Sequence, residues 1–282
     1  GANDEKILGE GVHKQYGKGK GGFNIVSNQF SIHYFFKNKN TLNGFLRNVS
    51  ECCKVGGYFI GTSYDGETIF NKLRSKELGE GVSIFRGDKK LWEVKKQYNG
   101  EEFEDDASSL GYAIDVYQES INKVFREYLV NYSYLTRILE NYGFVPLTPA
   151  EYKRLGLPES SGMFRQLYHQ MTNDIKRDRR LANSFGMAPD MREDEREISF
   201  LNRYFIYKKV RNVDADKIAE RYIKKEIDDT SIDLLETEKA QEVIAELQVE
   251  ALKSDEKEEK EEKEEPVIEK PKKSKRKLKL KS

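Results

Sequence analysis

Phe23-Asn-Ile-Val-Ser-Asn-Gln-Phe30 and Tyr58-Phe-Ile-Gly-Thr62 are two apolar runs bounded by glycines, and they predict two buried strands. The segment 39–54 between them predicts a helix that begins at Thr41 as its N-cap and ends before Gly56-Gly57. Its apolar side chains recur at helical spacing: Leu42, Phe45, Leu46 and Val49. Strand, crossover helix and strand in this order are typical of a parallel sheet, whose ligands bind at the carboxyl ends of its strands.

The rest of the chain predicts more elements of an α/β fold. Ile32 to Phe36 extends the first apolar run, and Gly87-Asp88 is expected to turn a hairpin. Further strands are expected over 82–85, 91–94, 113–117, 144–147 and 204–207, and helices over 67–77, 132–142, 149–155 and 162–182. Around one domain over 23–212 we expect a glycine-rich loop segment over 1–22, charged helices over 213–252 and a disordered tail over 253–282.

The formal charge of zero, from 49 basic and 49 acidic residues, is a cancellation between segments. Residues 255–269 hold nine acids and three lysines, whereas residues 270–281 hold eight bases and no acid. The basic end has the density of a phosphate-binding or nuclear-targeting segment, and a solvated tail is the alternative. Neutrality of the whole chain therefore does not exclude a nucleic-acid ligand.

Several other classes of site are disfavoured by the composition. The glycines of 17–22 lack the preceding strand that a phosphate loop needs, so a flexible loop is expected there. Two adjacent cysteines and three scattered histidines predict no disulfide and no metal site, and they fit a reduced intracellular protein. No apolar run reaches the length of about 20 residues that spans a bilayer, so no membrane is expected as partner.

At Gln29-Phe-Ser-Ile-His33-Tyr34-Phe-Phe the chain resembles the RNA cap guanine-N7 methyltransferases. The resemblance covers residues 8–212 and includes Gly56-Gly57-Tyr-Phe-Ile-Gly-Thr62, Arg126-Glu127-Tyr-Leu-Val130 and Arg203-Tyr204-Phe-Ile-Tyr-Lys-Lys209. The chain is most similar to the methyltransferase portion of the capping enzymes of large and giant DNA viruses. This resemblance implies a Rossmann-like class I α/β fold, S-adenosylmethionine as methyl donor, and N7 of the guanosine cap of mRNA as acceptor.

The resemblance also implies roles for five residues: Gln29 and Tyr34 in the donor site, and His33, Glu127 and Tyr204 in the guanine pocket. Guanine N7 carries no proton, so the transfer requires positioning rather than a general base, and no catalytic residue is expected. A buried carboxylate can accept hydrogen bonds from the guanine N1–H and amino group. A histidine can donate toward the guanine O6 atom.

Each of these residues also fits a structural role: a core histidine at His33, a strand-edge cap at Gln29, a surface carboxylate paired with Arg126 at Glu127, and core aromatics at Tyr34 and Tyr204. The position of Tyr204 depends on strand register. Because side chains alternate across a strand, a slip of one residue would change whether Tyr204 or Tyr207 faces inward.

The chain also departs from the family pattern, because no strand followed by a glycine-rich loop and a ribose-binding acid is found in it. We therefore expect it to be the C-terminal part of the domain, with the N-terminal part of the sheet missing, and to bind the donor poorly by itself. The expected partners are the capped 5′ end of mRNA and, on the same full-length chain, triphosphatase and guanylyltransferase modules. The expected location is the host cytoplasm or virion for a viral protein, or the nucleus from the basic tail.

Two other functions remain open. A chain without the donor loop could be a non-catalytic, methyltransferase-like subunit that stimulates a separate catalytic chain. A class I methyltransferase acting on another substrate is a third interpretation, which His33-Tyr34 and Glu127 disfavour.

Overall fold

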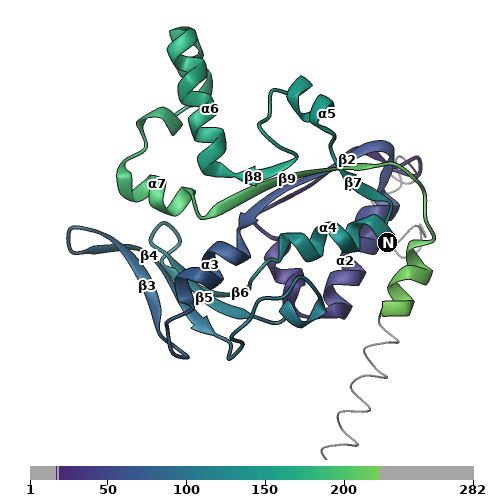
Figure 1. Cartoon of the computed structure of the whole chain (residues 1–282), viewed down its shortest axis with the longest axis horizontal. Coiled ribbons are helices and arrows are strands. Elements are labelled where there is room, and N and C mark those ends of the chain that lie inside the picture. Colours follow the sequence, from purple (N-terminus) through teal and green to yellow (C-terminus); the bar gives the residue numbers. More distant parts are fainter. Residues whose placement is uncertain (1–16, 18, 223–282) are drawn as a thin grey trace, which may run out of the picture. The chain divides into compact units, whose positions relative to one another are not determined.

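The computed structural model describes residue 17 and residues 19–222 (Figure 1). The chain divides into two compact units, residues 1–226 and 227–282, and the second lies wholly outside the described residues. The predictions for the tail and for most of the glycine-rich segment therefore fall outside the described part. Of the charged helices expected over 213–252, the structure describes one helical stretch, which includes residues 215–222.

The larger sheet is mixed. Strand β1 (Phe23–Gln29) runs parallel to β2 (Cys53–Tyr64), and β9 (Asn202–Lys209) lies antiparallel on the other side of β2. The short strands β7 (Phe144–Pro146) and β8 (Ser161–Met163) both pair antiparallel with β9. The predicted parallel unit and the Rossmann-like α/β class are confirmed by this arrangement.

The segment between β1 and β2 differs in detail from its prediction. The apolar run after β1 forms a 3-10 helix, η1 (Ile32–Lys37), instead of continuing as extended chain. Helix α2 (Lys39–Cys52) follows, and β2 begins directly after it. The Gly56-Gly57 pair therefore lies inside the strand rather than at the helix end. Gly56 has a φ of 82°, which any other residue would adopt only with strain.

Asn38, rather than Thr41, is the N-cap of α2. The Asn38 side chain accepts from the backbone N–H of Thr41 at 2.9 Å, and the Thr41 hydroxyl accepts from the Asn38 N–H at 3.3 Å. The two residues thus form a capping box, in which both satisfy backbone donors that the first turn leaves open. Both residue types favour helix starts, so composition alone did not separate them.

Replacing Asn38 with alanine is expected to lower the stability of the protein by about 1 kcal/mol, because the N-terminal N–H of Thr41 loses its partner. For a domain of this size, that corresponds to a fall in melting temperature of roughly 2–4 °C in a calorimetric scan. Asn40→Ala is the matched control, since Asn40 is exposed inside the same helix and is not its N-cap. Equal melting temperatures for the two variants would contradict the assigned cap.

One face of the larger sheet is covered by α2 and by α4 (Tyr132–Asn141), which was predicted correctly. The core between these helices and the sheet includes helix side chains (Leu42, Leu46, Val49, Leu135, Ile138 and Leu139) packed on strand aromatics (Phe59, Phe205 and Tyr207). Each such side chain contributes roughly 1.5–3 kcal/mol on full burial. This packing supports β2 and β9; β2 ends and β9 begins at the site described below.

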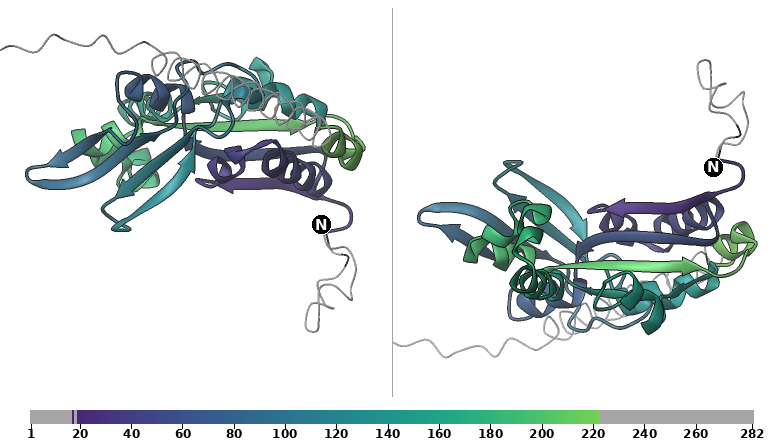
Figure 2. Two further views of the ribbon diagram at one scale, coloured as in Figure 1. Left: turned by 90° about the horizontal axis from the view of Figure 1, so that it is seen from below. Right: turned by 90° about the horizontal axis from the view of Figure 1, so that it is seen from above.

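A second, four-stranded antiparallel sheet extends from one end of the larger sheet (Figure 2). Its strands, in spatial order, are β3 (Gly81–Arg86), β4 (Lys89–Gln97), β5 (Ala113–Gln118) and β6 (Lys123–Tyr128). The hairpin at Gly87-Asp88 is confirmed, whereas β6 was not predicted. Helix α3 (Gly66–Leu73) buries Ile69 and Leu73 in a separate core with Trp92 and Val94 from this sheet.

The remaining elements lie between β7 and β9, except for η2 (Ala107–Ser109) before β5. They are α5 (Pro149–Arg154), α6 (Phe164–Arg177), η3 (Arg179–Phe185), η4 (Ala188–Asp190) and α7 (Glu193–Ser199). The predicted helix over 162–182 is too long. Asp178 is extended and its side chain accepts from the Arg180 N–H, so α6 ends there and η3 begins.

Candidate functional site

A pocket of about 510 Å³ lies where the second sheet meets η1 and the ends of β2 and β9. Its polar and aromatic lining includes His33, Tyr34, Tyr64, Trp92, Glu127 and Asn202. Three of the five residues predicted for the site are therefore brought together here: His33, Tyr34 and Glu127. They come from η1 and β6, which pack against each other.

The strand register explains why Glu127 faces this pocket. Glu127 on β6 lies opposite Ile114 on β5, and Phe125 lies opposite Val116. Because alternate residues share one face, Glu127 lies on the same side of the sheet as Phe125 and the buried β5 side chains. Arg126 points the other way, where its guanidinium pairs with Asp115. The alternative in which Glu127 is a surface carboxylate paired with Arg126 is therefore wrong.

His33 and Glu127 are buried, with 7% and 10% of their side-chain surface exposed, and most of their side-chain polar atoms lack a partner in the described part of the chain. Both imidazole nitrogens and Oε2 of Glu127 have no hydrogen bond, and Nδ1 of His33 lies 3.6 Å from that oxygen. Buried polar atoms in native proteins are nearly always satisfied. A cluster of unsatisfied atoms that line one pocket therefore indicates a polar ligand.

Burial moves the pKa values of these two groups in opposite directions, because it penalises the charged form of each. The pKa of Glu127 rises from 4.5 to about 7, and the pKa of His33 falls from 6.5 to about 4. The 3.6 Å contact is therefore not an ion pair at neutral pH, since the imidazole is uncharged. A neutral imidazole beside a half-ionised carboxyl offers both a hydrogen-bond donor and strong acceptors to a ligand.

Tyr34 and Phe30 lie at the mouth of the pocket. The Tyr34 ring packs edge-on against His33, with 4.3 Å between centroids, and it is half exposed. Phe30 has a φ of 50°, which is rare for a residue with a side chain, and its ring contacts Phe164 of α6. Strained backbone of this kind clusters at functional sites. Phe30 agrees with this tendency, because it joins β1 to η1 and lines the pocket.

The pocket lining also includes residues that were not predicted from the sequence, among them Tyr64, Trp92, Gln118 and Asn202. Tyr64 at the end of β2 is the ladder partner of Asn202 at the start of β9. Trp92 on β4 is the ladder partner of Gln118 on β5. Only their positions beside the segments that resemble the family could have indicated two of these residues. Tyr64 lies two residues after Thr62, and Asn202 lies two residues before Tyr204.

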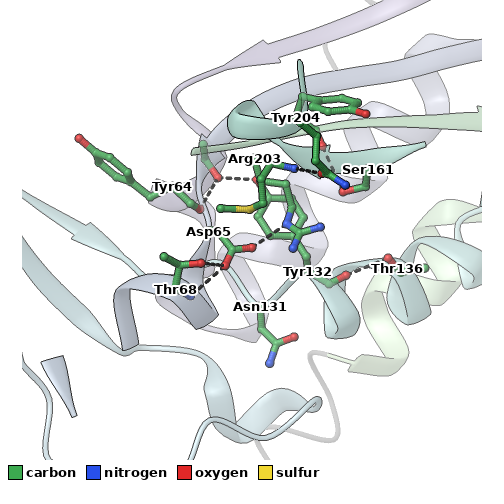
Figure 3. A network of polar contacts seen from close by, with 12 residues as sticks. Tyr64, Asp65, Thr68, Asn131, Tyr132, Thr136, Ser161, Arg203 and Tyr204 are labelled. Carbon is green, nitrogen blue, oxygen red and sulfur yellow. Dashed lines mark hydrogen bonds and ion pairs between the residues drawn. The ribbon is translucent and has the colours of Figure 1, made fainter. Parts of the chain in front are cut away.

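A polar network behind the pocket fixes the ends of β2 and β9 (Figure 3). Asp65 caps α3 through the Thr68 N–H at 2.8 Å, and it also accepts from Nε of Arg203 at 2.6 Å. The Arg203 guanidinium lies 5.2 Å from the centroid of the Tyr132 ring, whose hydroxyl lies 2.7 Å from that of Ser63. Asp65 and Arg203 directly adjoin Tyr64 and Asn202 in sequence, so this network sets the position of both pocket residues.

The other two predicted residues lie elsewhere. The Gln29 side chain is at the carboxyl end of β1, where its Oε1 accepts from the Thr62 hydroxyl at 2.8 Å. The buried Tyr204 hydroxyl donates to the carbonyl of Glu159 at 3.0 Å, and Tyr204 does not line the pocket of His33 and Glu127. On β9 it is Asn202, and neither Tyr204 nor Tyr207, that lines this pocket.

Residues 19–222 show neither a metal-binding cluster nor a membrane-spanning helix. No group of three or more histidine, cysteine or acidic side chains there could hold a metal ion. Within the same range, no helix is both long and apolar enough to cross a membrane.

The fold and the pocket define a Rossmann-like α/β protein with a buried site for a polar ligand. Residues 6–210 match the family model of the mRNA (guanine-N(7))-methyltransferase domain. The chain belongs to this family, which confirms the resemblance found at Gln29 to Tyr34.

Individual relatives agree with this assignment. The chain is 26% identical over 216 residues to a "Probable mRNA-capping enzyme" of Acanthamoeba polyphaga mimivirus, a match that covers 68% of this chain and 17% of that protein. It is 26% identical over 192 residues to the mRNA cap guanine-N(7) methyltransferase of Saccharomyces cerevisiae, covering 66% of this chain and 42% of that protein. An mRNA-capping enzyme of African swine fever virus is 26% identical over 178 residues, covering 62% of this chain and 20% of that protein.

The chain thus spans less than half the length of each of these relatives. Among solved structures, the CcbJ methyltransferase from Streptomyces caelestis is similar with a TM-score of 0.36 at 10% identity, over 68% of this chain and 59% of that one.

Proposed function

We propose that this protein takes part in methyl transfer from S-adenosylmethionine to N7 of the guanosine cap of mRNA. The observation that carries the proposal is the cluster of unsatisfied buried atoms on His33 and Glu127 in one pocket. Guanine presents donors at N1 and N2 and an acceptor at O6, which match a carboxylate and an imidazole N–H. The family membership of residues 6–210 supports the same ligand.

In this proposal the chain acts by binding and orientation. Glu127 accepts from the guanine N1–H and amino group, and His33 donates to O6, so that the ring is held in one orientation. The pocket walls exclude water and fix N7 for reaction, which can lower a barrier by several kcal/mol as an entropy effect. As N7 gains the methyl group the ring becomes positively charged, and the anionic form of Glu127 stabilises this charge.

S-adenosylmethionine supplies an electrophilic methyl group. Gln29 and Tyr34 are the residues of this chain that we propose face it. Gln29 lies at the carboxyl edge of the parallel strands β1 and β2, where ligands of open α/β sheets bind, and Tyr34 lies beside the guanine pocket. Tyr204 is left out of the proposed site because its hydroxyl is engaged by Glu159.

The capped 5′ end of mRNA is the proposed partner. We also propose that triphosphatase and guanylyltransferase modules act on the same full-length chain, a view supported by viral relatives of which this chain spans one fifth or less. Because capping of mRNA takes place inside cells, an intracellular location is part of the proposal.

The test is transfer of a labelled methyl group from S-adenosylmethionine to RNA that begins with GpppA, made with the full-length protein. We expect the label in m7GpppA after nuclease digestion, and none with RNA that begins with ApppA. Binding of capped RNA without any transfer would favour the alternative of a non-catalytic stimulatory subunit. The absence of both binding and transfer would overturn the proposal.

A further inference from the structure

The Tyr64 hydroxyl group has an unusual hydrogen-bond environment at the wall of the pocket. It accepts from Nε1 of Trp92 at 2.8 Å and from Nε2 of Gln118 at 3.0 Å. Trp92 and Gln118 are ladder partners on β4 and β5, so both donors come from neighbouring positions of the second sheet. Tyr64 itself is buried, and it comes from β2 of the larger sheet.

A phenol oxygen has two lone pairs and one hydrogen. The indole N–H of Trp92 can only donate, and Nε2 of Gln118 also donates, so both lone pairs of the Tyr64 oxygen are occupied. The hydroxyl hydrogen is left over, and it has no acceptor among residues 19–222. Burial raises the pKa of Tyr64 to about 12, so the hydroxyl keeps this hydrogen at neutral pH.

Tyr64 lines the pocket, on the side away from the network behind it. Figure 3 shows the Tyr64 side chain pointing away from Asp65 and Arg203. On the neighbouring strand, Asn202 uses its Nδ2 group on the carbonyls of α7, while its buried Oδ1 atom has no partner. This wall of the pocket therefore presents one free donor and one free acceptor, beyond those of His33 and Glu127.

We infer that Tyr64 donates a hydrogen bond to the purine base, held in that orientation by Trp92 and Gln118. The inference rests on the proposed function and adds a specificity-determining residue to it. The acceptor is the carbonyl oxygen at C6 of guanine. Adenine carries an amino group at that position. The Tyr64 hydroxyl and this amino group would both be donors, so the buried hydroxyl hydrogen would stay unsatisfied. Tyr64 thus favours a 6-oxo purine over a 6-amino purine.

The test is calorimetric binding of GpppA and ApppA, which carry the same triphosphate charge, with the ratio of their dissociation constants as readout. Tyr64→Phe retains the ring and removes the donor. We expect it to bind GpppA roughly 3- to 10-fold more weakly and to lose a similar factor of selectivity over ApppA. Tyr117→Phe is the matched control, because its hydroxyl bonds Asn122 outside the pocket. It should leave the ratio unchanged.

A second variant keeps the phenol in place in case Tyr64→Phe disturbs Trp92. A carboxylate can only accept, so Gln118→Glu should draw the Tyr64 hydrogen toward residue 118 and away from the ligand. We expect the same loss of selectivity as for Tyr64→Phe. If wild type prefers GpppA and both variants keep the full preference, the inference is overturned while the proposed function stands. If wild type shows no preference for GpppA, both are overturned.

Discussion

Glu127→Gln is expected to weaken binding of GpppA by roughly 100-fold, which corresponds to about 2.7 kcal/mol. The carboxylate is buried in the pocket, where it can accept from two guanine N–H groups. Hydrogen bonds to a charged group contribute about 1.5–3 kcal/mol each, and an amide can satisfy only one of the two donors while it presents an N–H to the other. The measurement is calorimetric titration at pH 8, where Glu127 is mostly ionised.

Glu119→Gln is the matched control for this variant. Glu119 follows β5 on the same sheet, pairs with Lys89, and is not part of the pocket lining. It loses the same charge, so it should bind GpppA as wild type does. Binding by Glu127→Gln within threefold of wild type would show that Glu127 does not contact the base.

Binding of GpppA should strengthen about tenfold between pH 6 and pH 8. The pKa of Glu127 lies at about 7 because burial disfavours the carboxylate. If guanine requires the carboxylate, the competent fraction of free protein rises from about one tenth to about nine tenths over this range. His33, with a pKa of about 4, stays neutral throughout and contributes no slope.

The raised pKa of Glu127 makes the stability of the ligand-free fold fall with rising pH, whereas it makes binding improve. A carboxyl whose pKa is raised in the folded protein stabilises the fold below its unfolded pKa, and this contribution is lost as pH rises through about 7. The ligand-free protein should therefore lose stability over the range in which binding improves. Glu127→Gln should flatten the binding profile and remove this loss from the stability profile, measured by calorimetric titration and by thermal unfolding. A wild-type binding profile that is flat from pH 6 to pH 8 would contradict the assigned role of the carboxylate.

The strands and helices whose apolar residues recur with a clear periodicity were predictable from the sequence, and the exceptions have physical causes. The apolar run after Phe30 is compatible with a strand or a helix, and tertiary packing on β6 selects the 3-10 helix η1. Strand β6, Lys123–Tyr128, carries charged residues and leaves four of its side chains exposed, so its sequence has little apolar signal. Without β6, the sequence does not show that Glu127 belongs to a second sheet.

The site was predictable only where the family motif carries it. His33 and Glu127 are far apart in the sequence, and nothing in local periodicity predicts that η1 and β6 meet. The Tyr204 assignment depended on the register of β9, and the structure brings Asn202 to the pocket instead. Tyr64 and Gln118 carry no motif, and their role follows only from which hydrogen bonds the two sheets form across the pocket.

The central claim is that this pocket recognises guanine as the base of a cap. The most direct measurement is equilibrium binding of GpppA and ApppA to the wild-type protein, followed through the fluorescence of Trp92. This residue is the single tryptophan of the chain and lines the pocket. We predict a saturable change in its emission with GpppA, and at least tenfold weaker binding of ApppA. Equal affinities for the two dinucleotides would contradict the claim.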